Sequence, residues 1–296
     1  MSKIYLKNKN VIITGANQGL GYVIAKKFLI EGANVAILAR NKQKLESSFL
    51  ELMKFKNKNN KLLSFACDIS NKVECDDFFL KILNVFTSLD VMVNNAGVFG
   101  PMGKLEDVPW EAFVENISIN LLGSIYMCRL AIPIMKKNNS GKIINISGGG
   151  AAKPFPALAC YAAGKAGLVR FSEELAEDLK EYNIDVNVVA PGPLNTRFVD
   201  LALEAGVEKL GKSLYETILN IKKTGGSLEL VAELCAYLST NLTDGLTGKF
   251  ISARYDDWKK FHEIKEYIMT NEYYTMRRID EFNIQKFSNM INLKDL

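Results

Sequence analysis

Two side chains capable of proton chemistry, Tyr161 and Lys165, lie four residues apart. On a helix, residues at this spacing share a face, so we expect the Lys165 ammonium near the Tyr161 phenol, where it would favour the ionised form. A free phenol, with a pKa of about 10, is poorly matched to proton exchange at pH 7. The pair therefore predicts a tyrosine that acts as general acid or base.

A glycine-rich turn, Thr14–Gly21, follows the apolar run Val11–Ile13 and precedes an amphipathic stretch. This is the context that a phosphate-binding loop requires. Gly15 permits a tight turn, Gly19 lets a pyrophosphate approach the backbone, and Gly21 lets helix and strand pack closely. The helix N-terminus attracts negative charge. With the tyrosine–lysine pair, the turn predicts a dinucleotide-dependent oxidoreductase; the alternative is a merely structural turn.

Short apolar runs alternate with longer amphipathic stretches along the chain, which is typical of a parallel sheet covered by crossover helices. The predicted strands are 11–13, 35–38, 62–66, 91–93, 143–146 and 186–190, and the predicted helices are 20–31, 43–52, 74–86, 110–137 and 159–182. The predicted fold class is α/β, a Rossmann-like doubly wound parallel sheet in three αβα layers.

The chain of 296 residues shows no internal repeat and no linker that would divide it. We expect one dinucleotide-binding and catalytic domain over residues 1–252. A C-terminal helical extension, residues 253–296, is expected to pack on it. Residues 199–223 look helical and follow the sixth strand, so they are the candidate substrate lid at the carboxyl ends of the strands.

Composition narrows the choice of partners. Apolar residues make up 48% of the chain, and the 37 basic and 33 acidic residues are dispersed, giving a net charge of +4. This does not favour nucleic acid or a membrane surface. The N-terminal residues are polar, and no later run approaches about 20 apolar residues, so a cytoplasmic location is expected. No metal site is expected, because the five cysteines form no Cys-x-x-Cys pair and the chain has only one histidine. We interpret the cysteines as reduced, mostly buried thiols: Cys67, Cys75, Cys128, Cys160 and Cys235.

Further motifs occur in a fixed order. Asn94–Gly97 reads Asn-Asn-Ala-Gly, Asn120 lies in the following helical stretch, and Pro191–Thr196 has the form Pro-Gly-x-x-x-Thr. Together with Tyr161, Lys165 and a glycine turn that has three residues between its first two glycines, this order resembles the short-chain dehydrogenase/reductase family over about residues 8–252.

The resemblance implies specific roles. Tyr161 would give a proton to a carbonyl oxygen, Lys165 would hold the nicotinamide ribose and lower the tyrosine pKa, and Asn120 would bind a water that links Lys165 to solvent. For Asn120, the alternative is a core residue that satisfies backbone groups. The candidate cofactor-binding residues are Gly15, Asn17, Gln18, Gly19, Leu20, Gly21, Arg40, Asp68, Ile69, Asn95, Ala96, Gly97, Tyr161, Lys165, Pro191, Gly192, Leu194 and Thr196.

Arg40 ends the second predicted strand, where the adenosine ribose of a cofactor would arrive. An arginine there can pair with a 2′-phosphate, so NADP(H) is favoured over NAD(H). The alternative is a solvated Arg40 and a protein that also accepts NAD(H). Asp68 resembles the family's aspartate beside the adenine; the alternative is a neighbour of a helix N-cap.

One position departs from the family pattern. The family places a serine 13 residues before its tyrosine, and here that position is Gly148. Ser147 is one residue earlier, where an extended strand would turn its side chain to the opposite face. The flanking glycines could let the loop turn Ser147 inward or offer a backbone N–H instead. The candidate catalytic residues are therefore Asn120, Ser147, Tyr161 and Lys165.

Three functions compete. The first is an NADP(H)-dependent interconversion of a small-molecule carbonyl and alcohol. The second is an NADP(H)-binding protein of the same fold with weak or lapsed catalysis, which Gly148 motivates. The third, a sugar-nucleotide epimerase or dehydratase, is disfavoured because such relatives usually show another glycine spacing and a larger C-terminal domain.

The sequence also suggests which residues surround the substrate and how the chain self-associates. The expected apolar pocket residues are Phe99, Phe155, Leu158, Leu194 and Phe198, and the arginines considered for an anionic substrate group are Arg197, Arg254, Arg277 and Arg278. The helices 110–137 and 159–182 carry apolar stripes, and in the family such helices pair across a two-fold axis. A homodimer or homotetramer is therefore expected.

Overall fold

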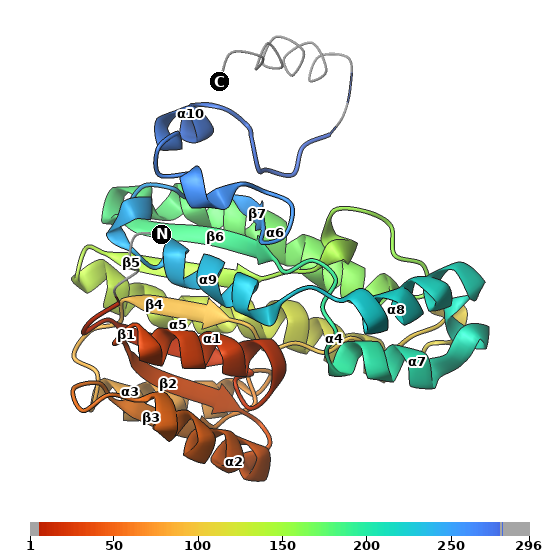
Figure 1. The fold of residues 1–296 in the computed structure, drawn as a ribbon, viewed down its shortest axis with the longest axis horizontal. Helices are drawn as coiled ribbons and strands as arrows, with labels where there is room; N and C mark the ends of the chain where they lie inside the picture. The colour runs from red at the N-terminus through yellow and green to blue at the C-terminus, as the bar shows by residue number, and fades with distance from the viewer. Residues whose placement is uncertain (1–5, 279, 281–296) are drawn as a thin grey trace.

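The computed structural model describes residues 6–278 and 280. Its centre is a sheet of seven strands in the order β3-β2-β1-β4-β5-β6-β7, all neighbours parallel (Figure 1). The strands are β1 Asn10–Thr14, β2 Asn34–Ala39, β3 Leu62–Ala66, β4 Val91–Asn94, β5 Gly141–Ile146, β6 Ile184–Ala190 and β7 Phe250–Ser252. The predicted doubly wound α/β fold is confirmed.

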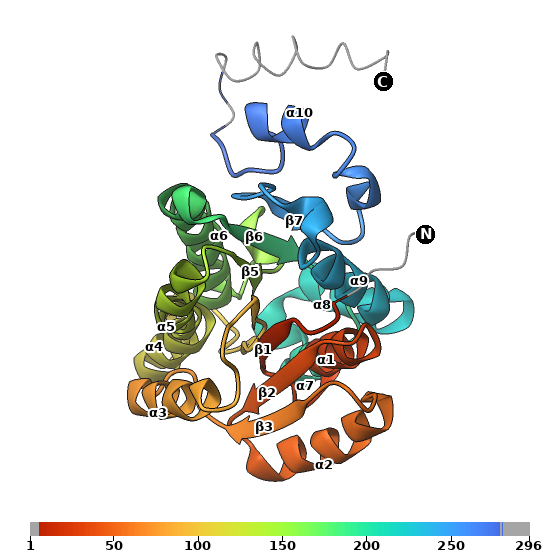
Figure 2. The same ribbon diagram turned by 90° about the vertical axis from the view of Figure 1, so that its left-hand side faces the viewer.

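Helices cover both faces of the sheet (Figure 2). The helices α1 Gly19–Ile30, α2 Lys42–Leu52 and α9 Leu228–Leu238 pack on one face through the larger apolar core. On the other face, α3 Lys72–Leu83, α5 Ser124–Lys137 and α6 Ala159–Leu179 enclose a second core. Strands buried on both faces must be apolar throughout, which explains why β1 and β5 read as continuous hydrophobic runs.

The stretch predicted as one helix over 110–137 has three parts. The helix α4 Trp110–Ile117 continues through a π-helical segment, Ser118–Gly123, into α5. A π-helical segment widens the turn and re-aims side chains, and such segments often occur at functional sites. Asn120 lies within it.

The predicted lid consists of two helices, α7 Arg197–Leu210 and α8 Lys212–Thr224, at the end of the molecule toward which the strands point (Figure 1). Gly206 and Gly211 have φ values of 80° and 75°, a region in which glycine is favoured, and they interrupt the helical path. Two elements escaped sequence prediction: the three-residue β7, too short for a periodic signal, and α9.

The C-terminal extension packs against the main core rather than forming one of its own. Trp258, Phe261 and Ile268 are buried in the cluster that contains α1 and α9. The buried Lys249 donates hydrogen bonds from Nζ to three backbone carbonyls of the extension, at 2.9–3.2 Å. Among the described residues the extension contains one short α-helix, α10 Lys265–Thr270, and residues 281–296 of the predicted helical tail lie outside the described part.

The continuous helical stretch Trp110–Lys137 is, by length and composition only, long and apolar enough to cross a membrane. Met127, Cys128, Ala131 and Met135 of this stretch are buried against the sheet, as in a core helix of a globular domain. The criterion alone is therefore weak evidence for a membrane.

Candidate active site

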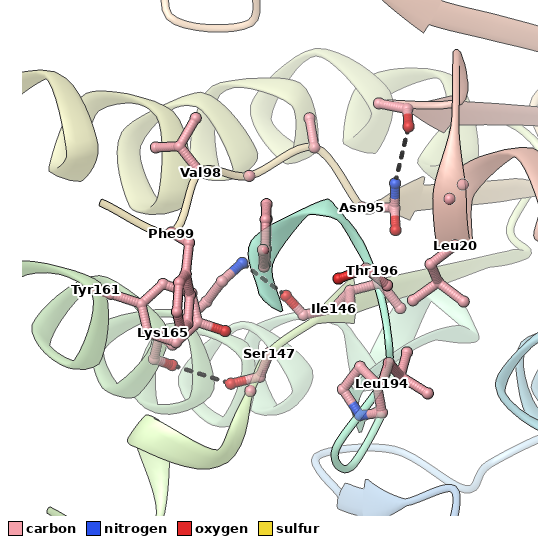
Figure 3. Close-up of a pocket in the computed structure, with 18 of the residues that line it drawn as sticks. Leu20, Asn95, Val98, Phe99, Ile146, Ser147, Tyr161, Lys165, Leu194 and Thr196 are labelled. Carbon is pink, nitrogen blue, oxygen red and sulfur yellow. Dashed lines mark hydrogen bonds between the residues drawn. The ribbon is translucent and has the colours of Figure 1, made fainter. Parts of the chain in front are cut away.

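A cleft of about 1140 Å³ runs along the carboxyl ends of the strands. Every residue predicted to bind the cofactor lines it, from the glycine turn after β1 to the loop after β6. Parallel strands bring their carboxyl ends to one edge, which is why motifs 180 residues apart in the chain meet there. Figure 3 shows Leu20, Asn95, Tyr161 and Thr196 around this space.

The glycine turn is packed tightly on one side and open on the other. A Cβ at Gly15 would lie 2.7 Å from the Cα of Ala96, and Gly15 has a φ of +65°. A Cβ at Gly19 would meet no described atom within 4 Å, so space remains above this residue. Gln18 precedes α1 without a side-chain cap, which leaves helix N–H groups available to an anion. The residues fit a dinucleotide pyrophosphate.

The loop after β4 fixes this turn. Thr14 Oγ1 accepts hydrogen bonds from the backbone N–H groups of Asn95 and Ala96, both at 3.0 Å. The Asn95 side chain donates to the carbonyls of Thr14 and Gly15. The predicted Asn-Asn-Ala-Gly motif therefore connects β1 and β4 beside the nucleotide cleft.

Arg40 lines the cleft directly after β2, with its guanidinium largely exposed and 3.6 Å from Glu115 Oε1 of α4. Lys44 lines the same part of the cleft and was not predicted, although its position four residues after Arg40 is a signal the sequence contains. The Asp68 carboxylate accepts hydrogen bonds from the N–H and hydroxyl of Ser70, while Asn71 caps α3. Asp68 thus lines the cleft and also shapes its own turn.

Tyr161 and Lys165 project from α6 into the cleft and are 7% and 4% exposed. Among the described residues, no hydrogen-bond partner occupies the Tyr161 hydroxyl. The amine of Lys165 donates to the Ile146 carbonyl at 2.9 Å (Figure 3). Burial raises the pKa of Tyr161 to about 12 and lowers that of Lys165 to about 8. In this arrangement desolvation, not the lysine charge, dominates the tyrosine pKa, and its direction is opposite to the sequence-based expectation.

Asn120 is fully buried and satisfied by its neighbours. Its side chain accepts from the Val98 N–H at 3.1 Å and donates to the Val98 carbonyl at 2.8 Å and to Asn116 Oδ1. A Cβ at Gly97 would lie 2.7 Å from Asn120 Oδ1 and 3.4 Å from Lys165 Nζ. Asn120 and the lysine amine therefore flank Gly97, and the predicted water relay remains a prediction.

Gly148 leaves room that the Tyr161 hydroxyl occupies. A Cβ at this position would overlap the Tyr161 hydroxyl oxygen and lie 3.1 Å from Cζ. The Ser147 hydroxyl donates to the Lys165 backbone carbonyl at 3.3 Å, so it is engaged with α6 (Figure 3). The structure therefore brings Ser147 to the cleft wall while its hydroxyl is bonded elsewhere.

The part of the cleft next to Tyr161 is mainly apolar. Phe99 meets the Tyr161 ring edge-on at 5.0 Å and stacks on Phe198 at 5.4 Å. Phe155 and Leu194 also line the cleft as predicted, whereas Leu158 is buried behind it. An apolar wall desolvates a bound carbonyl and strengthens the hydrogen bonds made to it.

Of the four arginines considered for an anionic substrate group, one lines the cleft and three do not. Arg197 lines the cleft. The side chain of Arg254 lies against Gly192, behind the loop after β6, while Arg277 pairs with Glu173 and Arg278 with Asp280. The extension instead contributes Tyr255, Asp256 and Tyr274 to the cleft wall, a contribution that no local pattern in the sequence signals.

The fold and site together define an NAD(P)-dependent oxidoreductase acting on CH–OH and C=O groups. A model of the short chain dehydrogenase family matches residues 9–205, and the chain belongs to this family. It is 32% identical over 251 residues to the 3-oxoacyl-[acyl-carrier-protein] reductase of Chlamydia muridarum, covering 83% of this chain and 96% of that protein.

Solved structures agree with this assignment. An NADPH-dependent reductase involved in bacilysin biosynthesis is 27% identical, with a TM-score of 0.75 over 83% of this chain and 97% of that one. The NAD⁺-bound xylitol dehydrogenase is 23% identical and superposes with a TM-score of 0.76 over 83% and 97%, which shows the shared fold. Both cofactor types thus occur among similar proteins.

Proposed function

We propose that this protein uses NADP(H) to interconvert the carbonyl and alcohol forms of a small organic molecule, with Tyr161 as general acid and base. The observation that carries the proposal is Tyr161, whose ring is largely buried beside an apolar wall and whose hydroxyl opens onto the cleft without a hydrogen-bond partner among the described residues. A hydroxyl in this position is free to donate a hydrogen bond to a ligand. A substrate oxygen would accept it.

The cofactor would supply or accept the hydride. In the reductive direction, the substrate oxygen would take the Tyr161 proton as negative charge develops on it. The high pKa of Tyr161 keeps that proton in place at neutral pH, and the Lys165 ammonium would stabilise the phenolate that remains. Lys165, with a pKa of about 8, is mostly charged at pH 7. The proposed relay through Asn120 would then return a proton.

The preference for NADP(H) is supported by Arg40 and Lys44, two cations that line the cleft where the second strand ends. Arginine pairs with phosphate through two parallel hydrogen bonds, and each charge-assisted bond contributes about 1.5–3 kcal/mol. Glu115 competes for the same guanidinium at 3.6 Å. NADH acceptance is the alternative, and the ratio of kcat/KM for the two cofactors decides between them.

Self-association is proposed through the outer face of α4 and the π-helical segment. Trp110, Val114 and Leu122 are 66%, 45% and 54% exposed there, although large apolar side chains rarely gather on a free surface. A second copy of the same face would bury them in a homodimer. Sedimentation velocity of Trp110→Asp should show a monomer; an unchanged mass would refute this interface. A homotetramer would need a second surface as well.

The function is tested with purified protein, NADPH and a panel of aldehydes and ketones, following absorbance at 340 nm for any cofactor oxidation. Tyr161→Phe should abolish turnover of any substrate found while cofactor affinity, measured by fluorescence, stays within about twofold. Turnover that survives in the phenylalanine variant would refute Tyr161 as the acid. Cofactor binding without turnover of any carbonyl would instead support the second candidate, a binding protein with lapsed catalysis, which the missing serine at Gly148 motivates.

A further inference from the structure

Two cysteines lie together in the wall of the cofactor cleft. Cys67 directly follows β3 and lines the cleft, and Cys75 is in the first turn of α3. Their sulfur atoms are 4.0 Å apart, and both side chains are buried. The sequence alone did not signal the pair, since the eight-residue spacing matches no thiol motif.

The other cysteines of the chain differ from this pair. Cys128, Cys160 and Cys235 are single buried thiols, and burial raises the pKa of each. Cys75 differs from them: its hydrogen bond with Cys67 lowers the pKa of the Cys75 thiol against the opposing effect of burial. A disulfide needs two sulfur atoms within reach of each other, and the contact between Cys67 and Cys75 meets that condition.

We propose that Cys67 and Cys75 are an oxidative modification site, a dithiol that hydrogen peroxide converts to a disulfide at the expense of cofactor affinity. In this reaction the peroxide O–O bond breaks and an S–S bond forms. The two sulfur atoms are oxidised, and the two oxygens leave as two water molecules that take up the two thiol hydrogens. Cys67 is 2% exposed and lines the cleft, so the cleft is the side from which peroxide would approach it.

The mechanical link runs through the turn between the two cysteines. A disulfide bond is about 2.05 Å long, so the sulfur atoms must approach by about 2 Å. Asp68 and Ile69, both lining the adenine end of the cleft, directly follow Cys67, and the Cys75 sulfur lies 3.6 Å from the Ile69 carbonyl. Ile69 is also packed closely against Gly123, where a Cβ would meet it at 2.9 Å.

Closing this gap would pull on the turn between the cysteines and shift the residues at the adenine end of the cleft. A bound cofactor should slow disulfide formation, because it would hold this turn in place and cover Cys67 from the side of the cleft. The inference rests on the proposed NADP(H) site but not on Tyr161 chemistry, so thiol mapping and cofactor affinity test it in the absence of turnover.

The experiment exposes the reduced full-length chain to hydrogen peroxide with and without saturating NADP⁺. Peptide mass mapping should find a Cys67–Cys75 disulfide, formed more slowly when NADP⁺ is present. NADPH affinity should fall by about fivefold or more and recover with dithiothreitol. Oxidation confined to other cysteines, or a disulfide that leaves affinity unchanged, would overturn the proposal.

Single substitutions distinguish the effect of a Cys67–Cys75 disulfide from the effect of oxidation elsewhere in the chain. Cys75→Ser and Cys67→Ser should keep their NADPH affinity after peroxide, whereas the matched control Cys160→Ser should lose it as the natural sequence does. Circular dichroism checks folding, and Cys75→Ala serves if the serine variants fail to fold. Equal loss of affinity in the Cys75 variant and the control would contradict the proposed site.

Discussion

Adding one methyl group at Gly148 should displace the tyrosine proposed as the acid. Gly148 is extended, with φ −168° and ψ 172°, so alanine can adopt its backbone and the effect is confined to the side chain. A Cβ there would come closer to the Tyr161 hydroxyl oxygen than the 3.0 Å that real Cβ atoms keep. Restoring ordinary contact requires the oxygen to retreat by on the order of 1 Å.

The ring of Tyr161 has little freedom to make that move. It is 7% exposed, and Phe99 meets it edge-on while Phe198 stacks behind Phe99. Overpacking of this kind costs about 1–3 kcal/mol of stability, and a misplacement of about 1 Å at a reacting group can cost about a hundredfold in rate. We therefore expect Gly148→Ala to lower kcat by about 10- to 100-fold and the free energy of unfolding by about 1–3 kcal/mol.

The assay is steady-state NADPH oxidation with the substrate that the natural sequence turns over, together with urea unfolding. Gly149→Ala is the matched control, because a Cβ at Gly149 would meet no described atom within 4 Å. Gly148→Ser introduces the family's serine into the same overlap and should also lose activity. If Gly148→Ala kept both kcat and stability, or if Gly148→Ser were faster than the natural protein, the placement of Tyr161 argued here would be refuted.

Charged groups in the cleft and at the C-terminal extension can be tested in the same way. First, kcat/KM for reduction should fall as pH rises through about 8, because Lys165 loses its charge there, and a flat profile from pH 6 to 10 would contradict this role. Second, Arg40→Ala should raise KM for NADPH about tenfold and leave KM for NADH unchanged. Glu115→Gln should lower KM for NADPH, because it frees the Arg40 guanidinium. Equal effects on KM for both cofactors would refute a contact between Arg40 and the 2′-phosphate. Third, Lys249→Met should lower the free energy of unfolding by about 2–3 kcal/mol and expose the extension to proteolysis, because three backbone carbonyls lose their hydrogen bonds to the buried ammonium. An unchanged midpoint of urea unfolding would show that these hydrogen bonds do not hold the extension in place.

Local hydrophobic patterns in the sequence were sufficient to predict most strands of the sheet. Six of the seven strands and the glycine turn appear in the structure where the sequence predicted them, because a strand buried on both faces needs an apolar run whatever surrounds it. The family order of motifs then placed the predicted cofactor residues, and all of them line one cleft. The location of a site in a parallel sheet follows from topology, since every strand ends at the same edge.

Contacts between distant segments were beyond the reach of these patterns. The approach of Cys67 to Cys75 depends on how α3 begins, and the placement of Asp256 in the cleft depends on an extension whose apolar residues are too scattered to form a periodic signal. The spacing predicted that Lys165 lies on the same face of a helix as Tyr161. The carbonyl that accepts a hydrogen bond from its amine, Ile146, belongs to the distant strand β5, which the spacing does not indicate.

The amino-acid sequence by itself determined the order of the strands along the chain, the phosphate-binding turn and the pair of side chains available for proton transfer, because each depends on residues that are neighbours in the chain. Only the tertiary structure decided the pKa of Tyr161 and the space that its hydroxyl occupies beside Gly148. Burial and overlap are properties of atoms packed from several elements, so no local spacing could specify them.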